Sequence, residues 1–379
     1  MILFLLLGIL IVSLLWESYY KRQWSKAVLV KLWFESAYVY AGQETKLYEV
    51  IENRKNIPVP VLEVRFRTKK ELDFANADNI NVSDYIYKRD IFAILGRQKI
   101  TREIPVKCTK RGRYTVNDAE ITTRTLLYGK YYNKGIETPA EIYVYPKMTD
   151  VSELITVCEQ MLGTLQCAKR LYEDPFAFRT IRSYTPDDPM KTINWKASAK
   201  TGSLMVNTYD SVQSPKAMIF LDVEDTGILK REGLVEESIA MAATLVRKLL
   251  GQNIEVGFCY NGDGQIMMPT NSKSDLTGLE RMLSEYNPET ENKDFEQLIR
   301  ELFAVTFSKK PLSQDTLLIF ISKNLDQQLM ECIRDCVGEY QTLVVVPVYR
   351  GEKTAWRDNI NAIKSKDNVQ VLVKEVERG

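Results

Sequence analysis

The chain has 379 residues, of which 45% are hydrophobic and 27% are charged, and its formal net charge is +1. This length suits two ordinary domains with cores of their own, and the near-neutral charge argues against a protein that binds nucleic acid through its phosphates. The sequence has no histidine, which excludes Ser-His-Asp and Cys-His catalysis and histidine-ligated metal sites.

The chain begins with an apolar run from Met1 to Trp16. We expect residues 1–24 to form a transmembrane anchor, which the tyrosines after the run and Trp24 extend through the membrane interface. The basic residues of this region all follow the run: Lys21, Arg22 and Lys26. The positive-inside rule therefore predicts a single-pass protein of the cell membrane with the bulk of its chain in the cytoplasm. A secretory signal is the alternative, although no basic region precedes the run and no small-residue cleavage site follows it.

Residues 25–148 contain short runs rich in β-branched and aromatic residues, separated by turn signals such as Ala41-Gly42. This pattern predicts an antiparallel β-sandwich of immunoglobulin-like kind. The expected strands are residues 27–34, 45–51, 59–67, 99–107, 113–116 and 141–145. A basic cluster lies between two of them and is interpreted as a hairpin turn with solvated charges: Lys107, Lys110, Arg111 and Arg113.

Residues 149–214 are interpreted as a connector, helical over 151–162, that contains a charged stretch from Arg179 to Tyr209. Within this stretch, Asp188 is expected to be the N-cap of a short helix with Pro189 at its first position. Gly202 should end that helix, because glycine readily takes the left-handed conformation after a helix.

The charged side chains of this stretch allow two interpretations. One is a solvated connector, since exposed ion pairs contribute only about 0–1 kcal/mol each. The other is that Arg182 pairs with Asp188 while Trp195 anchors the short helix between two domains.

The same stretch resembles the signature of a bacterial family known as domain of unknown function 58, Arg-x-Tyr-x-x-Gly-Asp followed by Arg-x-Ile-x-Trp-Lys-x-x-Ala-Arg. The matching residues are Arg182, Tyr184, Asp188, Ile193, Trp195, Lys196 and Ala199. Asp187 replaces the glycine of the signature. Lys191 and Lys200 replace arginines, so the charge is kept while the bidentate fork of arginine is lost.

This resemblance implies an architecture and a partner. It implies a membrane segment, a β domain, the signature and a C-terminal von Willebrand factor A-like domain. The partner that it implies is a MoxR-type AAA+ ATPase, working in assembly or cell-envelope processes. Members of the family often carry two membrane segments, whereas this sequence shows one.

Strands alternate with helices in residues 215–379, which predicts a doubly wound, mostly parallel sheet and a multidomain α+β protein overall. The expected strands are residues 217–221, 254–260, 316–321 and 342–349, and the expected helices are residues 234–250, 274–286, 294–307 and 325–340. Asn261-Gly-Asp-Gly264 is interpreted as a hairpin turn rather than a phosphate loop, because no Gly-Lys-Ser/Thr follows it.

Ligands bind such sheets at the carboxyl ends of the strands, and Asp222 follows the first strand. With Glu224 and Thr226 at the serine positions, the segment resembles the Asp-x-Ser-x-Ser metal motif of von Willebrand A domains. The resemblance implies a later aspartate where this chain has Lys323, whose charge would repel a cation. We therefore expect a degraded site without metal or other cofactor, kept as a relic or as a protein-contact surface. A bound Mg²⁺ is the alternative.

The sequence shows no nucleophile elbow, Walker loop or protease constellation, and its six cysteines lack zinc-ligand spacing. It therefore predicts a protein that is not an enzyme but a membrane-anchored cytoplasmic scaffold or adaptor, whose A-like domain docks a partner. Two other functions stay open: an enzyme that acts on an envelope precursor through Asp187 and Asp188, and a metal-dependent adhesion module.

Overall fold

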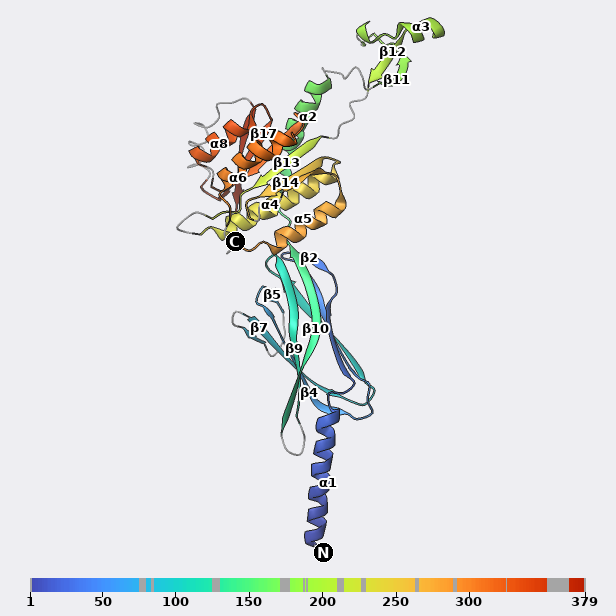
Figure 1. The fold of residues 1–379 in the computed structure, drawn as a ribbon, viewed down its shortest axis with the longest axis vertical. Helices are drawn as coiled ribbons and strands as arrows, with labels where there is room; N and C mark the ends of the chain where they lie inside the picture. Colours follow the sequence, from blue (N-terminus) through green and yellow to red (C-terminus); the bar gives the residue numbers. More distant parts are fainter. Residues whose placement is uncertain are drawn as a thin grey trace. The chain divides into compact units, whose positions relative to one another are not determined.

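The computed structural model describes residues 2–74, 80–82, 85–124, 130–170, 178–186, 188, 190–209, 215–225, 230–262, 266–288, 292–324, 326–352 and 368–377. These residues form a mixed α+β fold that divides into two compact units (Figure 1). The first unit comprises Met1–Met148 and Gly278–Tyr286, and the second comprises Thr149–Thr277 and Asn287–Gly379.

Helix α1 (Ile2–Gln23) begins the first unit and is long and apolar enough to span a membrane over Phe4–Gln23. The apolar side chains of its first half are exposed. Tyr20 and Trp24, in contrast, are buried in a core cluster of the β-strands that follow. The predicted place of Tyr20 and Trp24 at the membrane interface is therefore wrong, because their rings complete the protein core.

Two sheets pack face to face in the first unit. Their strand orders are β1-β3-β8-β5 and β2-β10-β9-β4-β7-β6, and every described pair except β2 with β10 is antiparallel. The strands are β1 (Val28–Phe34), β2 (Tyr38–Tyr40), β3 (Glu44–Asn53), β4 (Val59–Lys69), β5 (Leu72–Asp73), β6 (Ile80–Val82), β7 (Tyr85–Ile94), β8 (Lys99–Cys108), β9 (Gly112–Arg124) and β10 (Tyr131–Tyr145). Leu47 and Val106 of one sheet share a core cluster with Val116 and Ile142 of the other, so the unit is a β-sandwich.

Arg111 corrects the interpretation of the basic cluster as solvated. Its side chain is buried, and its Nη1 donates to the carbonyl oxygens of Leu283 and Tyr286 at 2.6 and 2.8 Å. These carbonyls lie at the end of α5 (Lys273–Glu285), whose second half belongs to the first unit. The Arg111 guanidinium therefore satisfies carbonyl groups that a helix end leaves without intrahelical partners.

A six-stranded sheet of order β15-β14-β13-β16-β17-β18 forms the centre of the second unit. Its strands are β13 (Lys216–Leu221), β14 (Glu255–Tyr260), β15 (Ile266–Thr270), β16 (Thr316–Ile321), β17 (Thr342–Tyr349) and β18 (Val369–Val376). Only β15 is antiparallel to its neighbour among the described pairs, which confirms the expected mostly parallel sheet. The central strands are continuous apolar runs, because helices bury both faces of a doubly wound sheet.

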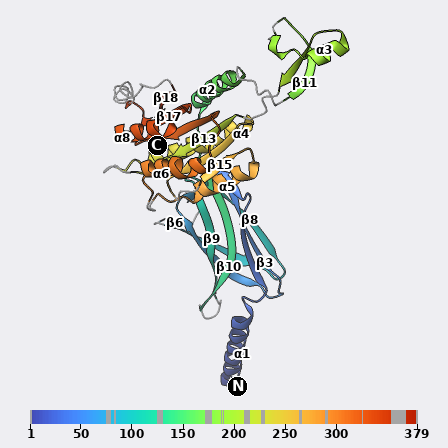
Figure 2. The same ribbon diagram turned by 45° about the horizontal axis from the view of Figure 1, so that its top comes forward.

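Helices cover both faces of this sheet (Figure 2). On one face, α4 (Glu232–Gly251) contacts β13, β14 and β17, and α2 (Ser152–Arg170) packs against α4. On the other face, α6 (Phe295–Glu301) and α8 (Gln327–Val337) share a core cluster with Phe220 and Phe320. A π-helical segment, η2 (Leu302–Thr306), and α7 (Phe307–Lys309) continue α6. The helices expected from the sequence are thus present, with shifted ends.

Candidate functional site

The charged stretch folds into a small antiparallel hairpin, here called the signature hairpin, residues 178–209. Its strands are β11 (Phe178–Ser183) and β12 (Met205–Tyr209), and a 3₁₀ turn, η1 (Met190–Thr192), and α3 (Trp195–Thr201) lie between them. Ile193 forms a bridge with Val206, and both side chains are buried. These contacts hold the short helix to one strand of the hairpin.

The N-cap of α3 is Asn194 rather than Asp188. The Asn194 Oδ1 accepts from the Ala197 N–H at 2.9 Å, and its Nδ2 donates to Oδ1 of Asn207 at 2.7 Å. The prediction of Asp188 as the cap is therefore wrong, because η1 separates that residue from the helix; Pro189 lies outside the described residues. Gly202 does end the helix with φ 73°, as predicted.

Arg182 and Asp188 form the predicted ion pair. The Arg182 Nη1 and Nη2 donate to the two carboxylate oxygens at 2.8 and 2.6 Å, and Thr185 donates its backbone N–H and its hydroxyl to the same carboxylate. The hydrogen bond from Arg182, followed by those from Thr185, holds the pKa of Asp188 well below its usual range. Asp188 is thus a charged brace of the loop. Asp187 lies outside the described residues.

Trp195 is exposed within its own unit, and its role as an anchor between two domains stays a prediction. Its side chain is 65% exposed, and Met190 and Leu204 are exposed as well. The helix is attached through hydrogen bonds of Asn194 and Ser198 to β12, so the indole at its first position is left facing solvent. The other signature side chains divide between the surface and the interior: Lys191, Lys196 and Lys200 are exposed, Tyr184 is half-buried and Ile193 is buried.

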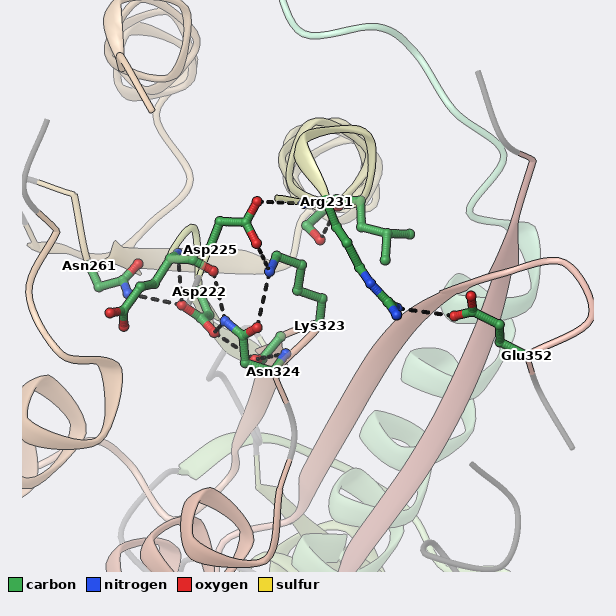
Figure 3. Close-up of polar contacts among 11 residues, drawn as sticks. Asp222, Asp225, Arg231, Asn261, Lys323, Asn324 and Glu352 are labelled. Atoms are coloured by element: carbon green, nitrogen blue, oxygen red, sulfur yellow. Dashed lines mark hydrogen bonds and ion pairs between the residues drawn. The ribbon is translucent and has the colours of Figure 1, made fainter. Parts of the chain in front are cut away.

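A second group of polar residues, here called the carboxyl-edge cluster, lies where three neighbouring parallel strands end (Figure 3). Its members are Asp222 and Asp225 after β13, Asn261 after β14, and Ser322, Lys323 and Asn324 after β16. The residue types are those of a ligand site, and their place in the sheet is where such sites occur.

Asp222 is the centre of this cluster. Its Oδ1 accepts from Nδ2 of Asn261 at 2.9 Å and from the Glu224 N–H at 3.0 Å. Its Oδ2 accepts from Oγ of Ser322 at 2.7 Å and from Nδ2 of Asn324 at 3.0 Å. Burial raises the pKa of the Asp222 carboxyl above its ordinary value, and these four hydrogen bonds oppose the rise. The Asp222 carboxylate therefore links the three loops that follow β13, β14 and β16.

Lys323 points into the cluster, although its position in the sequence suggested only repulsion of a metal. Its side chain is 4% exposed, and its Nζ lies 2.6 Å from Oδ1 of Asp225 and 3.0 Å from Oδ1 of Asn324. The second oxygen of Asp225 accepts from the backbone N–H of Arg231, the residue that precedes α4, at 2.6 Å. The Arg231 side chain extends away from Asp225 and pairs with Glu352 (Figure 3).

The residues present do not fit a divalent cation. Both oxygens of Asp222 are occupied by hydrogen-bond donors, and Lys323 engages Asp225. Glu224 contributes its backbone N–H to Asp222, and Thr226 lies outside the described residues. Within the described part of the chain, no three Asp, Glu or Cys side chains converge as a metal would require.

The hydrogen bonds that hold the carboxyl-edge cluster together were not predicted from the sequence. The sequence pattern indicated only a turn at Asn261 and assigned no role to Ser322 or Asn324. A signal was present, because Asn261 and Ser322 directly follow apolar strands of a parallel sheet and Asn324 lies two residues after Ser322.

Comparison with protein families places a match on the same part of the chain. The model of the family described as "Protein of unknown function DUF58" matches residues 180–354. This segment includes most of the signature hairpin and the sheet from β13 to β17. The match supports the family resemblance found in the signature. Comparison with curated proteins gave no match.

Comparison with solved structures gave distant likenesses. The CARDB domain of a Pyrococcus furiosus protein shares 15% identity over 31% of this chain and 93% of its own, with a TM-score of 0.20. A non-cellulosomal cohesin from Archaeoglobus fulgidus shares 14% identity over 34% of this chain and 96% of its own, with a TM-score of 0.21. A GH20 exo-β-N-acetylglucosaminidase from Vibrio harveyi shares 9% identity over 86% of this chain and 82% of its own, with a TM-score of 0.24. TM-scores this low carry no argument about this chain.

Proposed function

We propose that the chain is a non-enzymatic scaffold or adaptor of the cell membrane, which docks a MoxR-type AAA+ ATPase in assembly or cell-envelope processes. Helix α1 is its anchor, and both units lie in the cytoplasm. The basic residues Lys21, Arg22 and Lys26 after the apolar run support this orientation. The burial of Tyr20 and Trp24 supports an anchor over a cleaved leader, because removal of α1 would take a core side chain away.

We further propose that the first unit is immunoglobulin-like and that the second is a von Willebrand A-like domain. In the six-stranded sheet of the second unit, the strands counted along the chain lie in the order third, second, first, fourth, fifth and sixth, and one edge strand is antiparallel. Its polar cluster lies at the carboxyl ends of the strands, where the resemblance places the ligand site of such domains. These two features support the assignment.

The exposed Trp195 is the observation that carries the docking proposal. A tryptophan that faces solvent on a braced element resembles the energetic centre of a protein interface, because it can bury a large area with few rotamers to freeze. Met190 and Leu204 of the same hairpin add exposed apolar area. Arg182 and Asp188 keep the loop in one shape, which lowers the entropy lost on binding.

The charge of the signature hairpin indicates the kind of surface it fits. Lys191, Lys196 and Lys200 are exposed and have no carboxylate partner among the ion pairs of the described residues. We therefore expect the ATPase to present an apolar pocket for the indole with acidic residues around it. Asp188 is already bound by Arg182 and stays ionised, which suits a bracing residue better than a general acid.

Replacement of the indole tests this function. We expect Trp195→Ala to weaken binding of the purified ATPase to the detergent-solubilised chain by roughly 30-fold or more, since a central aromatic contributes about 2 kcal/mol or more. Its melting temperature should stay that of the parent, because substitutions at exposed positions usually change stability by less than about 0.5 kcal/mol. Surface-plasmon resonance and thermal melting measure the two quantities.

The matched control is Trp33→Ala, which removes another exposed tryptophan, on β1 of the other unit. This variant should bind the ATPase like the parent. The proposed function fails if Trp195→Ala binds as tightly as the parent, or if both tryptophan variants lose binding equally.

A further inference from the structure

We propose that the Lys323 ammonium is the resident cation of the carboxyl-edge cluster and takes the role that a divalent metal has in the motif which Asp222 resembles. This edge of the sheet then works without metal. The inference concerns the second unit alone and holds whether or not the signature hairpin docks an ATPase.

The contacts of Lys323 are those of a bridging cation. Its Nζ contacts carboxylate and amide oxygens from two loops, Asp225 after β13 and Asn324 after β16, at 2.6 and 3.0 Å (Figure 3). The amide of Asn324 continues the bridge, since its Nδ2 donates to Asp222 and to the backbone oxygen of Glu224 at 3.0 and 2.7 Å. A metal that ligated both loops would join the same two strand ends.

Burial shows that this contact is built into the fold. An ammonium that leaves water loses hydration free energy, so a lysine that is 4% exposed has to be paired. Asp225 supplies the opposite charge, and the N–H of Arg231 at the start of α4 holds its second oxygen in place. Without the ammonium, the Asp225 carboxylate and the Asn324 amide oxygen would lose the cation that they share. Both are oxygen ligands of the kind that a divalent cation prefers.

The test measures melting temperatures of the detergent-solubilised full chain, first in EDTA and then in millimolar Mn²⁺. The parent should melt at the same temperature in both. We expect Lys323→Ala to melt several degrees lower in EDTA and to recover most of that loss in Mn²⁺, because the ion replaces the ammonium between Asp225 and Asn324. Lys323→Gln removes the charge while keeping a polar contact, and should show the same recovery if Lys323→Ala does not fold.

The double variant Asp225→Asn/Lys323→Ala is the matched control. It lacks both charges of the pair, so it should melt above Lys323→Ala in EDTA and should not respond to Mn²⁺. A rise of several degrees for the parent in Mn²⁺ would overturn the inference, as would single variants that melt like the parent. Single variants that melt low and ignore Mn²⁺ would also overturn it, since the ammonium would then be a structural charge with no cation role.

Discussion

Glu49→Gln should make the protein more stable at about pH 8, by about 3 kcal/mol, while changing little at about pH 4.5. Glu49 lies on β3 between the two sheets of the sandwich, where it is 1% exposed. Neither of its carboxyl oxygens has a hydrogen-bond partner within the described residues. Burial, and then the charge of Asp90, raise the pKa of Glu49 to about 7.

The charges around Glu49 come from two strands. On β7, Lys88 and Asp90 are buried and form a pair with 2.7 Å between Nζ and Oδ2. On β8, Arg102 donates to the other oxygen of Asp90 at 2.6 Å. Asp90 is thus neutralised twice, whereas Glu49 is left with the weaker attraction of Lys88 and Arg102.

The sign of the pH effect follows from the raised pKa. Below about pH 4.5, Glu49 is protonated in both the folded and the unfolded chain and costs no ionisation energy. As the pH rises towards 7, the unfolded chain loses the proton first, so the folded state loses stability relative to Glu49→Gln. The gain of the variant should therefore grow between these two values and stay constant above them.

Thermal melting of the parent and Glu49→Gln across this pH range measures the difference. Glu103→Gln is the control, because Glu103 is an exposed glutamate on β8 that pairs with Lys46. Its effect on stability should be small at every pH. An advantage of Glu49→Gln that is equal at acidic and alkaline pH would show that Glu49 does not titrate in the core.

Asp222→Ala should destabilise the second unit by about 3 kcal/mol or more. The substitution removes one acceptor from four donors at once, namely the side chains of Asn261, Ser322 and Asn324 and the backbone of Glu224. A buried donor left without an acceptor costs about 1–3 kcal/mol, and the second contacts of the two asparagines offset part of this.

Ser322→Ala provides the comparison, since it removes a single donor and leaves three on the carboxylate. It should cost about 1 kcal/mol. The two variants are compared by thermal melting in EDTA, which keeps metal out of the measurement. If Asp222→Ala melted no lower than Ser322→Ala, the carboxylate would not be what joins the three loops.

The parts of the fold that depend on hydrophobic pattern were predictable. The buried runs of β16 and β17 have the bounds that the sequence indicated, because apolar continuity between polar turns leaves few alternatives. The longer strands β7 and β18 were missed, as were the shorter strands β2, β5, β6, β11 and β15. The alternation of Val369, Val371 and Val373 carried a strand signal for β18, but charged residues interrupt its final half.

The candidate site was less predictable, because it depends on which polar groups meet. Asp188 and Asn194 are both good helix caps by residue type, but Asp188 is bound by Arg182 and Thr185 while Asn194 caps α3. The exposure of Trp195 has no signature in the sequence, since a tryptophan at a helix start can be buried or exposed. Lys323 indicated a disrupted metal motif, whereas its contact with Asp225 required the three-dimensional positions of two loops.

Site-specific photocrosslinking in cells tests the central claim, that the signature hairpin is a docking surface for the ATPase. A photoreactive benzoylphenylalanine is placed at residue 195, or at residue 33 as the control on β1. Irradiation should join the chain to the MoxR-type ATPase from position 195 and not from position 33, because the indole of Trp195 faces solvent on the surface proposed to meet the partner. Crosslinks from position 195 that join only residues of the chain itself would contradict the claim, since Trp195 would then be an internal contact.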